Sequence, residues 1–181
     1  MSTLTVQNIQ GSSSSSNTIS VASGHKISGA AGAISVPGQV VQAVQLHTAG
    51  NVGTSSSSTV TTTSTSYVDF IQKAITTKLA NSLIFIKTYS MHYNNATVYG
   101  DGRILRDSTE IDACKYQFYI DGGNIFIPFG FQLLDSPGAA AGTTITYKQQ
   151  VKLTSSGTIR VGYGDSGGKV NTNMVLMEIA P

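Results

Sequence analysis

The stretch 83–93, which reads LIFIKTYSMHY, decides the fold class of this chain. Its first four residues are all apolar, which is typical of a strand covered on both faces. The rest alternates between two sets that point to opposite faces, Lys87, Tyr89, Met91 and Tyr93 against Thr88, Ser90 and His92. A helix fits the first four residues alone, but the β-branched and aromatic content and the polar flanks LANS and NNAT favour a strand. We therefore predict a central strand of a β-sandwich.

Outward from this strand, short segments of high β propensity alternate with turn residues, and no segment shows helical periodicity. Asp101-Gly102 is expected to form a hairpin turn, and Pro128 indicates an edge strand or a bulge. The pattern predicts an all-β fold, an antiparallel β-sandwich of the jelly-roll kind. The expected strands are 39–47, 59–70, 71–77, around 104–105, 111–120, 125–134, 143–153, 158–163 and 174–179.

Composition limits the classes of partner. Of 181 residues, 40% are hydrophobic and only 11% are charged, and the net charge of +2 comes without a basic cluster. This balance gives no reason to expect nucleic-acid binding. No stretch reaches the roughly 20 apolar residues that span a bilayer, so membrane insertion is not expected. A single cysteine, Cys114, allows no disulfide framework, and its alternating strand predicts a small buried side chain.

Residues 1–38 differ from the rest, because they offer only short extended pieces between glycines and a serine run. Each piece has too few apolar side chains to bury a face alone, and isolated strands leave open edges. We expect this segment to pair with its copies around a three-fold axis, forming the stalk of a homotrimer, while 39–181 fold by themselves. The apolar residues assigned to this stalk and anchor are Leu4, Val6, Ile9, Ile19, Val21, Ile34 and Val36.

Short motifs in a fixed order give the chain a family resemblance along nearly its whole length. It resembles the tail-fibre and related virion fibre proteins of tailed bacteriophages, especially those of marine bacteria. The matching motifs are Met1-Ser2-Thr3-Leu4 with Ile9-Gln10, Gly24-His25-Lys26-Ile27, Pro37-Gly38-Gln39-Val40-Val41-Gln42, Ser66-Tyr67-Val68-Asp69, Asn81-Ser82-Leu83-Ile84, Leu105-Arg106-Asp107 with Thr109-Glu110-Ile111, Leu134-Asp135-Ser136-Pro137, Ser156-Gly157-Thr158 and Leu176-Met177-Glu178-Ile179.

The resemblance implies a trimeric virion protein with a β-structured N-terminal stalk, 1–38, and a C-terminal β-sandwich knob, 39–181. It also implies contact with other virion proteins through the N-terminal segment, and exposure of the knob to a glycan or protein of the host surface. The chain has almost none of the repetitive shaft of long fibres, so a tail location and a capsid decoration or head-fibre role both stay open. Its start, MSTLTVQNIQ, lacks the pattern of a signal peptide, so we expect synthesis in the host cytoplasm and incorporation into the virion.

The strongest catalytic motif is Gly164-Asp165-Ser166-Gly167-Gly168, which is the sequence around the nucleophile of trypsin-like proteases. That chemistry needs a histidine base beside the serine and a buried aspartate behind it. None of the three histidines, His25, His47 and His92, lies in a suitable context, so a glycine-rich hairpin is the preferred interpretation.

Other sites are weaker still. Gly162-x-Gly164-x-x-Gly167 lacks the βαβ unit of a dinucleotide fingerprint. A glycosidase pair is less favoured than solvated turn residues for the carboxylates Asp101, Asp107, Glu110 and Asp112. The histidines lack metal-ligand spacing, although one histidine per chain on a three-fold axis stays open. We expect no enzyme activity, no cofactor and no metal.

Tyrosines suggest a contact role, since the chain has eight Tyr and no Trp, with many Tyr in its middle third. They can pack in the core or between subunits, which we prefer, or stack on sugars. Loops on a rigid β scaffold commonly carry binding. The predicted receptor-contact residues in such loops are Asn94, Asn95, Asp121, Asn124, Tyr163 and Asp165.

Overall fold

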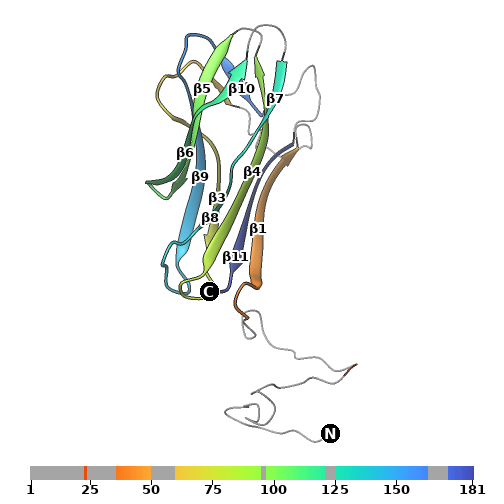
Figure 1. Ribbon diagram of the computed structural model, residues 1–181, viewed down its shortest axis with the longest axis vertical. Helices are drawn as coiled ribbons and strands as arrows, with labels where there is room; N and C mark the ends of the chain where they lie inside the picture. The colour runs from red at the N-terminus through yellow and green to blue at the C-terminus, as the bar shows by residue number, and fades with distance from the viewer. Residues whose placement is uncertain (1–22, 24–35, 50–59, 95–96, 121–124, 163–170) are drawn as a thin grey trace, which may run out of the picture. The chain divides into compact units, whose positions relative to one another are not determined.

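The computed structural model describes residue 23 and residues 36–49, 60–94, 97–120, 125–162 and 171–181 (Figure 1). The chain divides into two compact units, Met1–Ile34 and Ser35–Pro181. Val36 therefore belongs to the second unit. It lies in a turn where the Gln39 amide donates to the Val36 carbonyl, and its side chain is exposed.

The second unit contains antiparallel strands in two sheets, and no helix occurs among the described residues. The predicted all-β sandwich of antiparallel sheets is thus confirmed, while the jelly-roll connection, the stalk and the trimer stay predictions. The strands are β1 (Val40–Ala49), β2 (Val60–Thr62), β3 (Val68–Thr76), β4 (Leu83–Asn94), β5 (Val98–Arg106), β6 (Thr109–Ile120), β7 (Ile125–Phe129), β8 (Gln132–Asp135), β9 (Thr144–Leu153), β10 (Ile159–Val161) and β11 (Asn171–Ile179).

β4 is the centre of the larger sheet, as its sequence predicted. Its first half pairs with β8 on one side and β11 on the other, and its second half pairs with β7 and β10. β1 continues the sheet beyond β11, and β2 continues it beyond β10. β4 therefore has neighbours on both edges along its length, which satisfies the backbone of the longest apolar strand.

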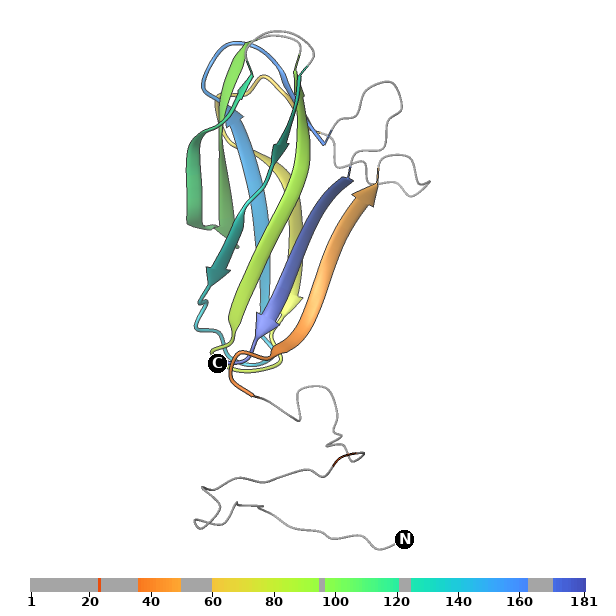
Figure 2. The same cartoon turned by 45° about the vertical axis from the view of Figure 1, so that its right-hand side comes forward.

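The smaller sheet has the order β3-β9-β5-β6 and packs against one face of the larger sheet (Figure 2). The core between them contains side chains of both sheets, including Ile84, Ile86, Ile104, Tyr147 and Leu176. All five are fully buried. This layer of large apolar groups is the main source of stability.

A break at Gly130 divides the predicted strand 125–134 into β7 and β8. A Cβ at Gly130 would lie 2.1 Å from the Thr88 carbonyl oxygen, so only glycine fits here. Beyond the break, Thr88 bonds Phe131 twice: its amide donates to the Phe131 carbonyl, and its Oγ1 accepts from the Phe131 amide at 2.8 Å. The Thr88 hydroxyl thus satisfies a backbone group that the interrupted ladder leaves free.

Asp101-Gly102 is not a hairpin turn, contrary to the prediction. Both residues lie inside β5, next to a bulge between Gly100 and Gly102. The hairpin turn lies farther on, between β5 and β6, where Asp107 has a positive φ of 53°. An Asp-Gly pair fits a bulged strand as well as a turn. Here Asp101 pairs with Lys152 of β9, and this pairing keeps both residues in the strand.

Cys114 is exposed, so the prediction of a buried side chain is wrong. It lies on β6, the edge strand of the smaller sheet, with exposed Asp112, Ala113 and Lys115 as neighbours. The bulge at Gly100/Gly102 shifts the register of β6 from Phe118 to Cys114. Between these positions β6 has more residues than β5, and this part of the strand is not covered by a second layer.

Candidate functional site

The second half of β4 buries polar side chains and turns larger, mostly aromatic or apolar ones outward. Thr88, Ser90 and His92 are buried between the sheets with Ile84 and Ile86. The opposite face of β4 carries Leu83, Phe85, Lys87, Tyr89, Met91 and Tyr93, all half-buried or exposed. The prediction that the alternating residues form two sets on opposite faces of the strand is confirmed. The prediction that the apolar start of the strand is covered on both faces is wrong, because the smaller sheet covers only one.

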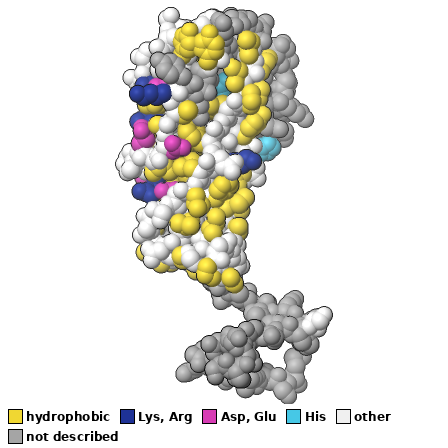
Figure 3. Space-filling view, viewed as in Figure 1, with side chains coloured by type: hydrophobic (Ala, Val, Ile, Leu, Met, Phe, Trp, Pro, Cys, Tyr) yellow, Lys and Arg dark blue, Asp and Glu magenta, His cyan; other side chains and the backbone are white. Residues whose placement is uncertain are grey.

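The outward residues of β4 continue across its neighbours. Cross-strand pairing aligns Pro128 with Met91, Leu134 with Phe85, and Met177 with Phe85 from the other side. We call this surface the apolar face, and Figure 3 shows hydrophobic side chains gathered along the sandwich over β4 and its neighbours. It consists of Leu83, Phe85, Tyr89, Met91, Tyr93, Phe126, Pro128, Leu134, Val175, Met177 and Ile179.

Aromatic rings form one end of the apolar face. The rings of Tyr93 and Phe126 lie 4.9 Å apart, and the guanidinium of Arg160 lies 5.8 Å above the Tyr93 ring. Nearby on the same strand, the Tyr89 hydroxyl donates to Met91 Sδ at 3.3 Å. Tyr89 is 39% exposed and Phe126 is 37% exposed. Aromatic and methionine side chains with this exposure are enriched at protein interfaces.

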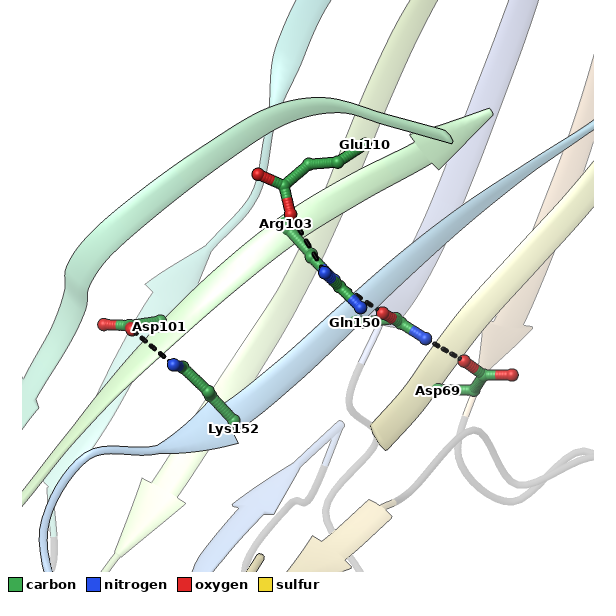
Figure 4. A network of polar contacts seen from close by, with 6 residues as sticks. All are labelled: Asp69, Asp101, Arg103, Glu110, Gln150 and Lys152. Carbon is green, nitrogen blue, oxygen red and sulfur yellow. Dashed lines mark hydrogen bonds and ion pairs between the residues drawn. The ribbon is translucent and has the colours of Figure 1, made fainter. Parts of the chain in front are cut away.

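The outer face of the smaller sheet is of the opposite kind. Figure 4 shows a chain of contacts in which Gln150 donates to Asp69 and accepts from Arg103, which in turn pairs with Glu110 at 2.9 Å. The hydrogen bond from Gln150 lowers the pKa of the Asp69 carboxyl. We call this surface the polar face, and its members are Tyr67, Asp69, Asp101, Arg103, Glu110, Lys148, Gln150 and Lys152.

Tyr67 organises the centre of the polar face. The Arg103 guanidinium lies 3.9 Å from the centroid of its ring, and the Lys152 ammonium lies 4.9 Å from it. Lys152 also pairs with Asp101 at 3.3 Å, and the Asp101 side chain is only 7% exposed. These cations are thus held by a ring and by carboxylates, which leaves the polar face balanced in charge.

Glu178 accepts hydrogen bonds from several groups at the end of the sandwich where β3 leads to β4. The amides of Lys78 and Leu79 donate to its carboxylate at 2.8 to 2.9 Å, as do the Ser82 hydroxyl at 2.9 Å and Gln42 Nε2 at 2.6 Å. Burial raises the pKa of the carboxyl, but these donors outweigh it, so the pKa of Glu178 is lowered. The carboxylate ties β1, β11 and the β3–β4 loop together.

A second carboxylate links the two sheets. Asp135, at the end of β8, accepts from Arg106 Nη1 of β5 at 2.9 Å and from the Tyr147 hydroxyl of β9 at 2.7 Å. Burial, with the neighbouring Asp135 carboxylate, raises the pKa of Tyr147 well above its ordinary value. The tyrosine therefore stays a hydrogen-bond donor throughout the accessible pH range.

Five of the motifs that carried the family resemblance contribute residues to these two clusters. The first cluster joins Gln42, Ser82 and Glu178, and the second joins Arg106 and Asp135. Sequence reasoning did not identify these residues as structural centres. A sequence pattern that could have identified them is a charged residue within an apolar strand, at a position where the alternation predicts burial. Glu178 within Leu176–Ile179 is an example.

The predicted catalytic candidates do not form a site in the described part of the chain. Ser166 and His25 lie outside the described residues. His47 is exposed on β1, and His92 is fully buried with its ring 4.2 Å from that of Phe129. The carboxylates considered for a glycosidase pair make different structural contacts. Asp101 is buried in an ion pair, and Asp107 accepts a hydrogen bond from the Thr146 amide. Within the described ranges, no group of three or more metal-ligating side chains occurs. These ranges also contain no helix that is long and apolar enough to cross a membrane.

The predicted loop and stalk residues lie mostly outside the described residues. Of the loop set, only Asn94 is described, at the end of β4, whereas Asn95, Asp121, Asn124, Tyr163 and Asp165 are not. Of the stalk set, only Val36 is described. The strand ends that flank these loops are adjacent, since Asn94 pairs with Ile125 and Val98 pairs with Ile120. The use of these loops in binding stays a prediction.

The tyrosines of the middle third lie mainly on the outer faces. Tyr89 and Tyr93 belong to the apolar face, while Tyr99 and Tyr119 stack at 4.9 Å on the smaller sheet. Among the tyrosines whose side chains the structure describes, Tyr147 is the one that is fully buried in the core. Core packing therefore does not explain the outer tyrosines. The other two predicted roles, contact between subunits and stacking on sugars, stay predictions.

Comparison with known proteins gives no family for this chain. No family model matches it, and neither does any curated protein. Among solved structures, it is similar to a chain of the infectious bursal disease virus particle, with 9% identity over 77% of this chain and 40% of that chain, at a TM-score of 0.42. The VP2 subviral particle of the same virus shows 10% identity, 87% and 46% coverage, and a TM-score of 0.35.

A domain of tailspike protein 4 from bacteriophage CBA120, described as enzymatically active, is 14% identical over 76% of this chain and 19% of that chain, at a TM-score of 0.28. This chain thus spans less than half the length of each of these structures.

Proposed function

We propose that this protein is a non-enzymatic structural subunit of a bacteriophage particle, a short tail-fibre-like trimer. Residues 1–38 attach it to other virion proteins, and the sandwich contacts the host surface. The supporting observation is the convergence of the resemblance motifs on the two buried carboxylate clusters. Glu178 and Asp135 each collect donors from motifs that lie far apart in the sequence.

The convergence matters because isolated short motifs match by chance. Ser82 and Glu178 are 96 positions apart, and Arg106 and Asp135 are 29 positions apart, yet each pair is hydrogen bonded. Hydrogen bonds between distant motifs fit an interpretation in which the motifs belong to one fold. The pairing is the observation on which we base the proposal, and the virion role is proposed by analogy with the proteins that the chain resembles.

The apolar face supports a role in an assembly. A monomeric soluble protein rarely exposes a contiguous apolar patch of more than a few hundred Å². The apolar face combines exposed Leu134, Tyr89 and Phe126 with half-buried neighbours on β4 and β11, so that it covers four strands. This broad face is also the observation that favours the second candidate, a capsid decoration or head-fibre protein that packs on a regular shell.

Immunogold labelling of intact particles with antibodies against the full chain tests the proposal. We expect label at the tail. Label over the capsid supports the decoration role instead, and particles without label, from lysates that contain the free chain, contradict both roles. An antibody against a known internal protein of the particle is the control for particle integrity.

Host contact and the lack of enzyme activity need a separate experiment. Purified full-length protein added to host cells should reduce adsorption of the particles, and heat-denatured protein should not. The same preparation should leave capsule polysaccharide intact and should not react at Ser166 with a fluorophosphonate probe. Release of reducing ends, or labelling that Ser166→Ala abolishes, would show that the protein is an enzyme.

A further inference from the structure

We propose that the apolar face is the surface through which copies of this chain pack against one another. The inference rests on the proposed function to the extent that a virion subunit acts as an oligomer. It goes beyond that function because it assigns the contact to the sandwich itself, with Tyr89, Met91 and Phe126 as its anchors.

The size of the face approaches that of a stable interface. β4 has 12 residues, and the members of the apolar face occupy three strand positions, with β11 on one side of β4 and β7 and β8 on the other. At about 3.3 Å per residue and about 4.8 Å between strands, the face measures roughly 40 by 14 Å, or about 560 Å² in projection. A standard interface buries about 800 Å² on each partner.

The charge of the face favours a second copy over a charged partner. Among the described residues of the larger sheet that point outward, the charged side chains are Lys87 and Arg160, and the latter stacks on Tyr93. The described part of this face therefore has no ordered network of charges that a partner would have to match, in contrast to the polar face. Interfaces between identical subunits are more apolar than transient ones.

The entry point of the chain brings copies together at this sheet. The Gly38 amide donates to the Ala180 carbonyl, and the Ala180 amide donates to the Gln39 carbonyl, so the chain joins the sandwich beside the end of β11. Residues 1–35 therefore precede, in the sequence, the point at which the chain enters the sheet that carries the apolar face. Copies joined through residues 1–38 would meet with a high effective concentration at this sheet.

A matched pair of variants tests the assignment in the full-length chain. Phe126 and Tyr119 are both exposed rings that stack on a cross-strand tyrosine with centroids 4.9 Å apart, Phe126 on the apolar face and Tyr119 on the smaller sheet. Phe126→Arg should raise the dissociation constant of the oligomer at least about tenfold in sedimentation velocity, the effect of losing one anchor. Tyr119→Arg should leave it unchanged. Equal effects of the two variants, or a wild-type chain that stays monomeric at all concentrations, would overturn the proposal.

Hydroxyl-radical footprinting identifies what covers the face. Peptides containing Tyr89 and Met91 should become protected as the wild-type concentration rises through the dissociation constant, while the peptide containing Tyr119 should not. Protection that does not depend on concentration would show that the chain's own N-terminal segment covers the face, and the proposal would fail. Association should also persist in molar sulfate, because apolar contacts are not screened. Dissociation by salt would instead indicate an electrostatic contact elsewhere.

These results are independent of the test on particles. If Phe126→Arg leaves the oligomer intact while the chain still labels virions, the interface proposal fails and the proposed function stands. If copies associate through the apolar face but no virion carries the chain, the proposed function fails alone.

Discussion

Arg106 of β5 and Asp135 at the end of β8 join the two sheets of the sandwich, with Arg106 Nη1 2.9 Å from Oδ1 and 3.1 Å from Oδ2 of the carboxylate. The Asp135 side chain is 9% exposed and that of Arg106 is 28% exposed, so the pair is only partly screened by water. The Tyr147 hydroxyl adds a third hydrogen bond from the core. One carboxylate of β8 therefore holds groups from two strands of the other sheet, β5 and β9.

Asp135→Asn should lower the free energy of unfolding by roughly 2–3 kcal/mol, because the amide leaves a largely buried guanidinium without its counter-charge. Urea denaturation measures this change. Asp112→Asn, on the exposed strand β6, is the control and should be close to neutral. A loss no larger than that of the control would mean that Asp135 does not hold the sheets together.

Glu178→Gln should cost about 2 kcal/mol and should change the acid limb of the stability curve. The folded-state pKa of Glu178 is lowered, so its contribution is present above the ordinary value near 4.5 and is lost as pH falls through the folded value. In the wild type, stability should therefore fall below about pH 4.5, and the variant should show a shallower fall. Denaturation midpoints at pH 7, 4 and 3 test this, and parallel curves would contradict the assignment.

His92 should make the protein less stable between pH 6.5 and 3. Burial lowers the pKa of His92 to about 3 from an ordinary value of 6.5, so the unfolded chain takes up a proton that the folded chain excludes. The loss should begin near pH 6.5 and level off near pH 3, amounting to a few kcal/mol. The window from pH 7 to pH 5 lies above the ordinary pKa range of carboxyl groups and therefore isolates the effect of His92.

His92→Phe should flatten the stability curve between pH 7 and pH 5, whereas His47→Gln, at an exposed site, should keep the wild-type slope. The measurement is the free energy of unfolding in urea at half-unit pH steps. An unchanged slope in His92→Phe would assign the pH dependence to another group.

Gln149 and Gln150 should respond in opposite directions to replacement by methionine. Gln149 is fully buried, and neither its Nε2 nor its Oε1 has a hydrogen-bond partner among the described residues. Gln149→Met should stabilise the protein by about 1–2 kcal/mol, because it removes an unpaired buried amide at similar volume. Gln150→Met should destabilise it, since that amide bridges Asp69 and Arg103. Thermal unfolding of both variants measures the two changes in stability. A destabilised Gln149→Met would contradict the prediction and would indicate a buried hydrogen-bond partner such as ordered water.

The sequence identified the central strand because pattern and propensity agree at 83–93. Four apolar residues followed by strict alternation have no other stable arrangement in a chain without helical periodicity. The same reasoning assigned β9 and β11 within one to three residues of their ends. The prediction of a turn at Asp101-Gly102 was wrong, because pairing with β9 outweighs the local preference of these residues for a turn.

The apolar face was harder to predict from the sequence than the strands were. The tyrosines pointed toward contact, and Tyr89 and Tyr93 do lie on the apolar face. Phe126 and Leu134 were expected only as parts of one apolar strand, and the break at Gly130 was not expected. That break depends on the approach of Gly130 to the Thr88 carbonyl, a contact between residues 42 positions apart.

By itself, the sequence determined that the chain folds into antiparallel strands and which residues of β4 share a face, because side chains alternate with a period of two. Only the tertiary structure decided which of the two faces is covered. The smaller sheet packs on the side of Thr88, Ser90 and His92, where the Phe131 amide needs the Thr88 hydroxyl. Burial is a property of what the second layer covers, and a local pattern does not contain it. The outward aromatic residues, and with them the apolar face, follow from that packing.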